Sequence, residues 1–399
     1  MKGTRMALIP QAHRMENAPL SRIREIIAYA GKLEAAGKAI IHLEIGEPDF
    51  DTPAHIVAAC KKALDEGKVH YGPVTGIPEL RAAVAAHYNR RYGSGYEADE
   101  VMITVGVEQG VYLSMNAYLN PGDEILVPDP GYLCYFTLPN IAGATPVSYP
   151  LEEKRHFQID AEGLEKLTTP RTKAILLNSP SNPCGSVLDG RSLRVVADLA
   201  ERHNLLVISD EVYADMVYGG KAFHSAASLP ELKKRLIVLH GFSKYFAMTG
   251  WRLGYMLCDR SLLDPMMRLN FYNLSCPGTF IQHAGLAALA EDDAPSRAMV
   301  REYGKRRDFM VEAVNALPGC SCLPPDGAFY LFVNIAGTGM NSDDFCRVMI
   351  DEAGVSMTPG HVFGGMGDGF VRVSYANSMN NLKRAMSLMR EVLEKRAAQ

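Results

Sequence analysis

Short apolar segments alternate with helical stretches between residues 100 and 258, and this alternation constrains the fold more than any other feature of the chain. Parallel strands need long crossover connections, which are usually helices, so the pattern predicts a mostly parallel sheet with helices on both faces. The predicted strands cover residues 101–105, 125–127, 174–177, 205–208, 236–239 and 253–257. This region is therefore expected to form an α/β unit.

The flanking regions follow other patterns. Apolar residues at helical spacing, followed by Gly37, predict a helix over residues 21–36, and a proline-rich loop leads into another helix at Ala54. Beyond residue 297 we expect a smaller α+β domain, in which a charged helix over 301–317 leads into the segment 327–333 and is followed by a helix from Asp343 and a strand over 370–373. We expect three parts: residues 1–50, a helix and segment joining the small domain; 51–290, the large domain; and 291–399, the small domain.

The composition excludes several classes of function. A balance of 41 basic and 45 acidic side chains gives a formal charge of -4, which creates no field for nucleic acid or anionic lipid. No apolar run approaches the roughly 20 residues of a membrane helix, and residues 1–10 lack the apolar core of a secretory signal. Eight cysteines are scattered without metal-binding spacing. We therefore expect a cytoplasmic protein with reduced thiols and no metal, nucleic-acid or membrane partner.

Polar residues follow the predicted strands at the sheet edge where α/β proteins bind ligands. Lys244, Asp210 and Asn182 each come after a different strand. Each also has an ordinary interpretation. Lys244 could simply reach solvent, Asp210 could cap a helix, and Asn182 could be a turn asparagine bonded to its own backbone. Their common position favours one shared ligand.

One cofactor, pyridoxal phosphate, accounts for these residues. A lysine whose nitrogen is bonded to a carbonyl as a Schiff base avoids the cost of burying a charge. Asp210 would keep a proton on the pyridine nitrogen, which keeps the ring an electron sink. Asn182 and Tyr213 could contact the phenolic oxygen of the ring.

Further residues fit the phosphate and the ring face. A helix predicted after Gly106 offers free N–H groups to a phosphate, Arg252 offers a guanidinium suited to a two-point contact, and Ser243 offers a hydroxyl. Tyr132 could lie flat against the planar ring. Alone, each of these is weak, since glycine commonly precedes helices and tyrosine is commonly a core residue.

With these residues in place, the sequence resembles the class I/II aminotransferases, which are fold-type I pyridoxal-phosphate enzymes. The matching motifs occur in the family's order at residues 46–50, 71–81, 178–185, 209–213, 243–244 and 370–373. The resemblance implies a large domain with a mostly parallel sheet, a smaller α+β domain and a homodimer with shared active sites. It also implies transfer of an amino group from an L-amino acid to a 2-oxo acid by a ping-pong mechanism.

The resemblance assigns roles around the cofactor ring. It implies that Lys244 holds the cofactor as an internal aldimine and that Asp210 pairs with the pyridine nitrogen. It further implies that Asn182 and Tyr213 contact the phenolic oxygen while Tyr132 stacks on the ring.

It assigns a second group of residues to the phosphate and the substrate. The implied phosphate contacts are the backbone of Val107 and Glu108, together with Ser243 and Arg252. Tyr71 matches a tyrosine that reaches the phosphate of the neighbouring subunit. Arg372 and the backbone of Gly46 match the clamp for the substrate's α-carboxylate, where Asn182 also lies.

Two positions depart from the family pattern. Glu108 stands where some relatives selective for aspartate carry a lysine that meets the distal carboxylate, and Gly241 stands where many relatives have a phosphate-binding serine. We therefore expect neutral amino donors, in a side-chain pocket lined by residues such as Tyr330 and Tyr132. The alternative that Glu108 contributes only its backbone and points away stays open.

The alternative functions are a nicotinamide dehydrogenase, a non-catalytic regulator and a β-lyase or synthase. A nicotinamide dehydrogenase needs G-x-G-x-x-G between a strand and a helix, which the chain lacks, since the glycine-rich segment 364–369 comes late and is expected to be a loop. A non-catalytic regulator would need an added DNA-binding module, for which the residues before Gly46 leave little room. A β-lyase or synthase on the same scaffold stays open, because the same carbanion can expel a β-substituent.

Overall fold

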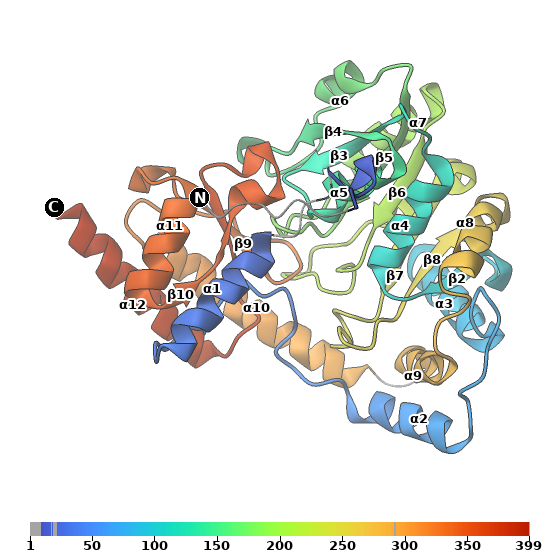
Figure 1. Cartoon of the computed structure of the whole chain (residues 1–399), viewed down its shortest axis with the longest axis horizontal. Helices are drawn as coiled ribbons and strands as arrows, with labels where there is room; N and C mark the ends of the chain where they lie inside the picture. The colour runs from blue at the N-terminus through green and yellow to red at the C-terminus, as the bar shows by residue number, and fades with distance from the viewer. Residues whose placement is uncertain (1–8, 17, 19–21, 291–292, 399) are drawn as a thin grey trace.

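A seven-stranded sheet forms the centre of the protein in the computed structural model, which describes residues 9–16, 18, 22–290 and 293–398 (Figure 1). Its strands, in spatial order, are β2 (Val101–Thr104), β8 (Gly254–Cys258), β7 (Leu236–Gly241), β6 (Leu206–Asp210), β5 (Thr172–Asn178), β3 (Glu124–Asp129) and β4 (Thr145–Pro150). Neighbouring strands from β7 to β4 are parallel, whereas β8 is antiparallel to both of its neighbours. The prediction of a mostly parallel α/β sheet is therefore confirmed.

The edge strand β4 was not predicted from the sequence. It contains Pro146 and Pro150, which cannot donate hydrogen bonds to a ladder and are tolerated at sheet edges. Of its six residues only Tyr149 is buried, so no apolar pattern marks the strand.

Helices cover both faces of this sheet. One face carries α4 (Val107–Tyr118), α5 (Cys134–Ala142) and α8 (Arg260–Asn273); the other carries α3 (Pro78–Tyr92), α7 (Gly190–Arg202) and α9 (Thr279–Ala290). Outside these layers, α2 (Ala54–Asp65) packs on α9, and α6 (Ala161–Leu167) packs on β4. In β7, Ile237 and Leu239 join the core on the first face, while Leu236 and Val238 join the other. The strand is thus buried on both sides, as a continuous apolar run predicts.

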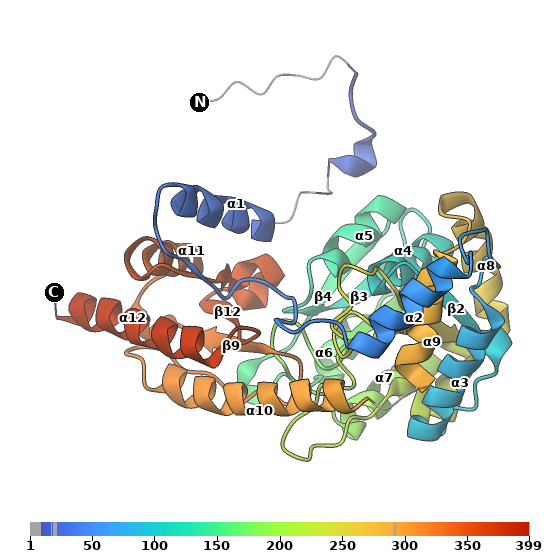
Figure 2. The same cartoon turned by 90° about the horizontal axis from the view of Figure 1, so that it is seen from below.

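The carboxyl-terminal residues build a smaller antiparallel sheet with its own helices, beside the large sheet (Figures 1 and 2). The sheet has the order β11 (Thr358–Pro359), β12 (Phe370–Ser374), β9 (Tyr330–Asn334), and the helices are α10 (Ala294–Asn315), α11 (Ser342–Val348) and α12 (Met379–Ala397). The amino-terminal segment joins this part: β1 (Ile41–His42) pairs in parallel with β10 (Val355–Ser356), and α1 (Arg22–Ala35) lies against it. Within the described residues, no helix is long and apolar enough to cross a membrane.

One predicted boundary in this part was wrong. Helix α10 begins at Ala294 rather than at residue 301, with a proline in its first turn, where the missing N–H costs nothing. Within the segment 327–333 the chain becomes a strand, β9, only at Tyr330, because Ala328 has a φ of +58°, which no strand residue adopts.

Candidate active site

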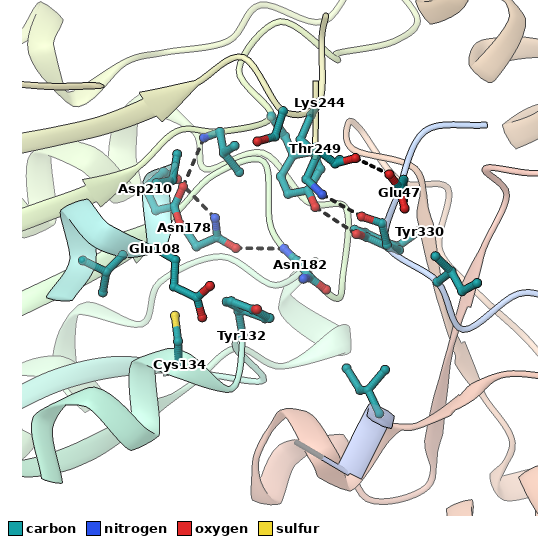
Figure 3. Close-up of a pocket in the computed structure, with 18 of the residues that line it drawn as sticks. Glu47, Glu108, Tyr132, Cys134, Asn178, Asn182, Asp210, Lys244, Thr249 and Tyr330 are labelled. Atoms are coloured by element: carbon teal, nitrogen blue, oxygen red, sulfur yellow. Dashed lines mark hydrogen bonds between the residues drawn. The ribbon is translucent and has the colours of Figure 1, made fainter. Parts of the chain in front are cut away.

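The predicted polar residues meet in a cavity at the carboxyl ends of β5, β6 and β7 (Figure 3). Its volume is about 370 Å³. The predicted site residues that line it are Gly46, Val107, Glu108, Tyr132, Asn182, Asp210, Tyr213, Ser243, Lys244, Arg252 and Arg372. The cavity lies between the large sheet and the smaller one, which contributes Arg372 from β12 and Tyr330 from β9.

Lys244 follows β7 and extends into the cavity. Its Nζ donates a hydrogen bond to the backbone oxygen of Gly46 at 2.6 Å and lies 5.7 Å from the ring centroids of both Tyr213 and Phe329. Burial, and then the positive charge of Arg372, lower the pKa of the amine to about 8. More of the amine is therefore uncharged at neutral pH than in an ordinary lysine, and the uncharged form is the nucleophile.

Asp210 lies at the carboxyl end of β6, and its carboxylate is buried. One oxygen accepts a hydrogen bond from the hydroxyl of Tyr135 at 2.7 Å, and the other accepts one from the backbone N–H of Val212 at 3.1 Å. Burial raises the pKa of this carboxyl group, while the bond from Tyr135 opposes the rise. A cation in front of the carboxylate would stabilise its charged form.

Arg372 presents a buried guanidinium without an anionic partner. Its Nη1 donates to Oδ1 of Asn182 at 3.0 Å, and its Nη2 donates to the backbone oxygen of Glu44 at 2.6 Å. Its Nε has no hydrogen-bond partner, and the acceptors of its two Nη atoms among the described residues, which include the hydroxyl of Thr358 at 3.5 Å, are all uncharged oxygens. A buried cation in this state favours an incoming carboxylate, and two-point recognition suits a guanidinium.

Asn182 and Tyr213 are oriented by these neighbours. Because Oδ1 of Asn182 accepts from Arg372, its amide nitrogen is left to donate to a ligand. The backbone N–H of Asn182 donates to the side chain of Asn178 at 2.8 Å. The hydroxyl groups of Tyr213 and Tyr330 lie 2.8 Å apart.

A phosphate-sized anion fits at the start of α4. Gly106, with a φ of +75°, precedes the first free N–H groups of the helix, and a Cβ atom there would lie 2.8 Å from the guanidinium of Arg252. The guanidinium thus approaches the helix amino terminus more closely than any side chain at this position would allow. Ser243 also lines the cavity.

Gly241 has a structural reason to be glycine. A Cβ atom on it would lie 3.1 Å from Cα of Gly254 and 3.2 Å from a methyl group of Val107, in the tight contact between β7, β8 and α4. No hydroxyl can enter there without movement of the backbone. Phosphate contacts are therefore left to Ser243, Arg252 and the helix start.

Tyr71 is the predicted site residue that the structure does not bring to the cavity. Its side chain is 92% exposed and lies on the surface near Cys276. Glu108 lines the cavity and is exposed, and Figure 3 shows its carboxylate extending toward Tyr132 and Cys134. This orientation contradicts the alternative that Glu108 points away.

Several residues of the cavity were not predicted. Tyr135 lies in the first turn of α5, three residues after Tyr132, whose backbone oxygen accepts a hydrogen bond from its N–H, a spacing that could have indicated a shared site. Thr249, whose hydroxyl donates to the carboxylate of Glu47, carries no sequence signal. The remaining unpredicted lining residues are Ile23, Ile27, Glu44, Ile45, Glu47, Val111, Cys134, Asn178 and Val212.

Comparison with known proteins agrees with this geometry. A family model described as aminotransferase class I and II matches residues 38–388. The chain belongs to this family. It is 41% identical over 388 residues to "aromatic-amino-acid aminotransferase 2" of Thermococcus litoralis, covering 96% of this chain and 98% of the relative. It is also 41% identical over 381 residues to an "aspartate aminotransferase" of Pyrococcus abyssi, covering 94% and 96%.

A solved structure described as alanine aminotransferase from Pyrococcus furiosus superposes on this aminotransferase with a TM-score of 0.92. The two chains are 34% identical, and the match covers 97% of this chain and 100% of that one. Pyridoxal 5′-phosphate is the cofactor of this family and of this enzyme, so the expected enzyme class and cofactor are confirmed. The residues fit the cofactor, because Lys244, the buried carboxylate of Asp210 and the Arg252 guanidinium at a helix start match its carbonyl, ring nitrogen and phosphate.

Proposed function

We propose that this aminotransferase takes the amino group from a neutral L-amino acid and transfers it to a 2-oxo acid by a ping-pong mechanism. The names of its relatives specify aromatic, aspartate and alanine substrates, so they do not select a donor. The cavity supports a neutral one. Among the described residues, the cations that line it are Lys244, Arg252 and Arg372.

Each of these three cations already has a task in this proposal. Lys244 binds the cofactor, Arg252 binds its phosphate, and Arg372 binds the α-carboxylate of the substrate. A distal carboxylate would therefore face Glu108 without any compensating cation from this chain. A neutral side chain avoids that cost.

When bound, the cofactor supplies a carbonyl carbon and an electron-withdrawing ring. The residues of the protein bind it, orient it and move the protons. Lys244 would hold the cofactor through its amine, and as a neutral amine it would take the proton from the α-carbon of the donor. Asp210 holds the proton of the ring nitrogen. Asn182 and Tyr213 donate to the phenolic oxygen.

A panel of amino donors with one fixed oxo acid tests the donor class. We expect kcat/KM to be higher for alanine, leucine, methionine and phenylalanine than for aspartate. Glu108→Lys should raise kcat/KM for aspartate relative to alanine by about tenfold or more, because it adds the missing cation. Glu108→Gln is the matched control, since it removes the negative charge without adding a positive one. A wild-type enzyme that prefers aspartate would exclude this proposal.

We further propose that two copies of the chain form the active unit and that Tyr71 reaches the phosphate of the partner's site. Tyr71 and several neighbouring apolar side chains are exposed to a degree unusual for large residues. The exposed neighbours are Val69, Phe271, Tyr272 and Leu274. The backbone N–H of Gly72 donates to the thiol of Cys276 at 3.4 Å, which joins the two segments that carry them.

Hybrid dimers test this shared site. Tyr71→Phe and Lys244→Ala subunits, each poorly active alone, should regain activity when mixed, because one of the two sites in a hybrid dimer keeps both residues. At full exchange half of the dimers are hybrids, so we expect about a quarter of the wild-type sites to be intact. Mass spectrometry confirms the exchange. No recovery after confirmed exchange would place Tyr71 outside the partner's site.

We also propose that the enzyme is cytoplasmic. All eight cysteines are free thiols, and seven of them are buried. A reducing compartment keeps thiols in this state.

A further inference from the structure

Helix α1 forms one wall of the active-site cavity. Ile23 and Ile27 lie four residues apart, hence on one face of the helix, and both line the cavity. Ile45 lines it as well, from the loop after β1. Ile27 and Ile45 are 40% and 38% exposed, so this wall is an apolar surface that the protein itself leaves uncovered.

The polar groups of the cavity have other partners in the proposed function. Lys244, Asp210 and Arg252 face the cofactor, and Arg372 faces the α-carboxylate. The part of the donor that extends away from these groups is its side chain. Of the apolar side chains that line the cavity, those of Ile27 and Ile45 are the most exposed, and Ile23 lies on the same helix face as Ile27, so this wall is open to a donor side chain.

We infer that Ile23 and Ile27 contact the side chain of the amino donor, and that they make the enzyme select large apolar donors, aromatic ones included, over alanine. This inference rests on the neutral-donor specificity proposed above and adds a preference for size. The selection follows from the apolar surface buried on binding. A phenylalanine side chain covers both isoleucines, whereas the methyl group of alanine covers little of either.

Contacts along α1 hold this wall in place. The hydroxyl of Tyr29 donates to Asp351 at 2.7 Å, and the guanidinium of Arg347 lies 4.3 Å from the centre of the Tyr29 ring. Farther along the helix, His42 lies 3.1 Å from Glu34. The wall is thus attached to the smaller sheet and its helices by polar contacts outside the cavity, which isoleucine substitutions leave intact.

The helix offers its own matched control. Ile26 has the same side chain and sits between the two wall residues in sequence, but it lines a separate cavity with Tyr29, Arg347 and Val362. A substitution there removes the same three carbon atoms from α1 without touching the donor side of the helix.

Kinetics of Ile23→Ala, Ile27→Ala and Ile26→Ala, each with phenylalanine and alanine as donors, test the inference. The wild-type enzyme should use phenylalanine with a higher kcat/KM than alanine. Ile23→Ala and Ile27→Ala should each lower kcat/KM for phenylalanine about tenfold and change the value for alanine less than about twofold. Ile26→Ala should change neither value. Melting temperatures of the holoenzymes confirm that all three variants are folded.

A further variant separates the loss of apolar contact with the donor from a change in packing around α1. Ile27→Asn keeps a branched side chain of similar length but is polar, and it should also lower the phenylalanine-to-alanine ratio of kcat/KM. An unchanged ratio in Ile23→Ala, Ile27→Ala and Ile27→Asn, or an equal change in Ile26→Ala, would overturn the inference, as would a wild-type enzyme that prefers alanine. Each of these results leaves the neutral-donor proposal standing, which only a preference for aspartate would remove.

Discussion

Lys244→Ala is expected to lower kcat by about 10³-fold or more, because one amine both releases the cofactor and moves the α-proton. The variant should still bind pyridoxal phosphate through Asp210, Arg252 and the start of α4. Its visible absorbance should change from that of the lysine-bound cofactor to that of the free aldehyde. Absorbance titration and single-turnover kinetics measure the two effects separately.

Lys244→Arg is the control for charge, since it keeps a cation in the cavity but offers no nucleophilic amine. It should be as inactive as Lys244→Ala. Added small amines should restore part of the activity of the alanine variant by acting as external bases. Near-normal turnover in either variant would remove Lys244 from its proposed role.

Asp210→Asn is expected to slow α-proton removal by about 10²–10⁴-fold. Asparagine is close to aspartate in size but cannot stabilise a charged ring nitrogen, and an uncompensated buried charge costs about 3–5 kcal/mol, which corresponds to that range. The hydroxyl of Tyr135 can still donate to the new amide oxygen, so the fold should persist. The rate is measured in single turnovers, and a primary isotope effect with α-deuterated donor shows whether proton removal limits it.

The neighbouring residue provides the comparison. Glu211 is also buried, and burial raises its pKa to about 7, but its carboxylate accepts hydrogen bonds from Ser225 and Ser209 and does not line the cavity. Glu211→Gln should therefore reduce stability rather than the chemical step. If Asp210→Asn and Glu211→Gln slowed proton removal equally, Asp210 would have no special relation to the ring nitrogen.

Much of the large sheet was predictable because its strands bear strong local signals. Strands β3, β5, β6 and β7 are continuous apolar runs, as strands buried on both faces must be. The edge strand β4 escaped prediction because its side chains are mostly accessible and two of its residues are prolines. An apolar sequence pattern thus marks a strand whose side chains are buried, and few side chains of an edge strand are buried.

The residues after the strands were predictable for a topological reason. Parallel strands place their carboxyl ends at the same edge, so Asn182, Asp210 and Lys244 had to lie near one another whatever the details of packing. Arg372 was identified by resemblance to a family rather than by its position. Its approach to Asn182 depends on how β12 packs against the large sheet, which no local pattern encodes.

The sequence by itself therefore determined the α/β sheet, the edge at which the cofactor residues gather, and the chemistry those residues favour. The tertiary structure decided what faces that edge. The spacing of Ile23 and Ile27 shows only that they share a helix face, and packing of α1 against the smaller sheet turned that face toward the cavity. Likewise, only the fold left Tyr71 exposed on the surface. Sequence periodicity shows which residues share one face of a helix or strand. What that face contacts depends on packing between segments that are distant in the sequence.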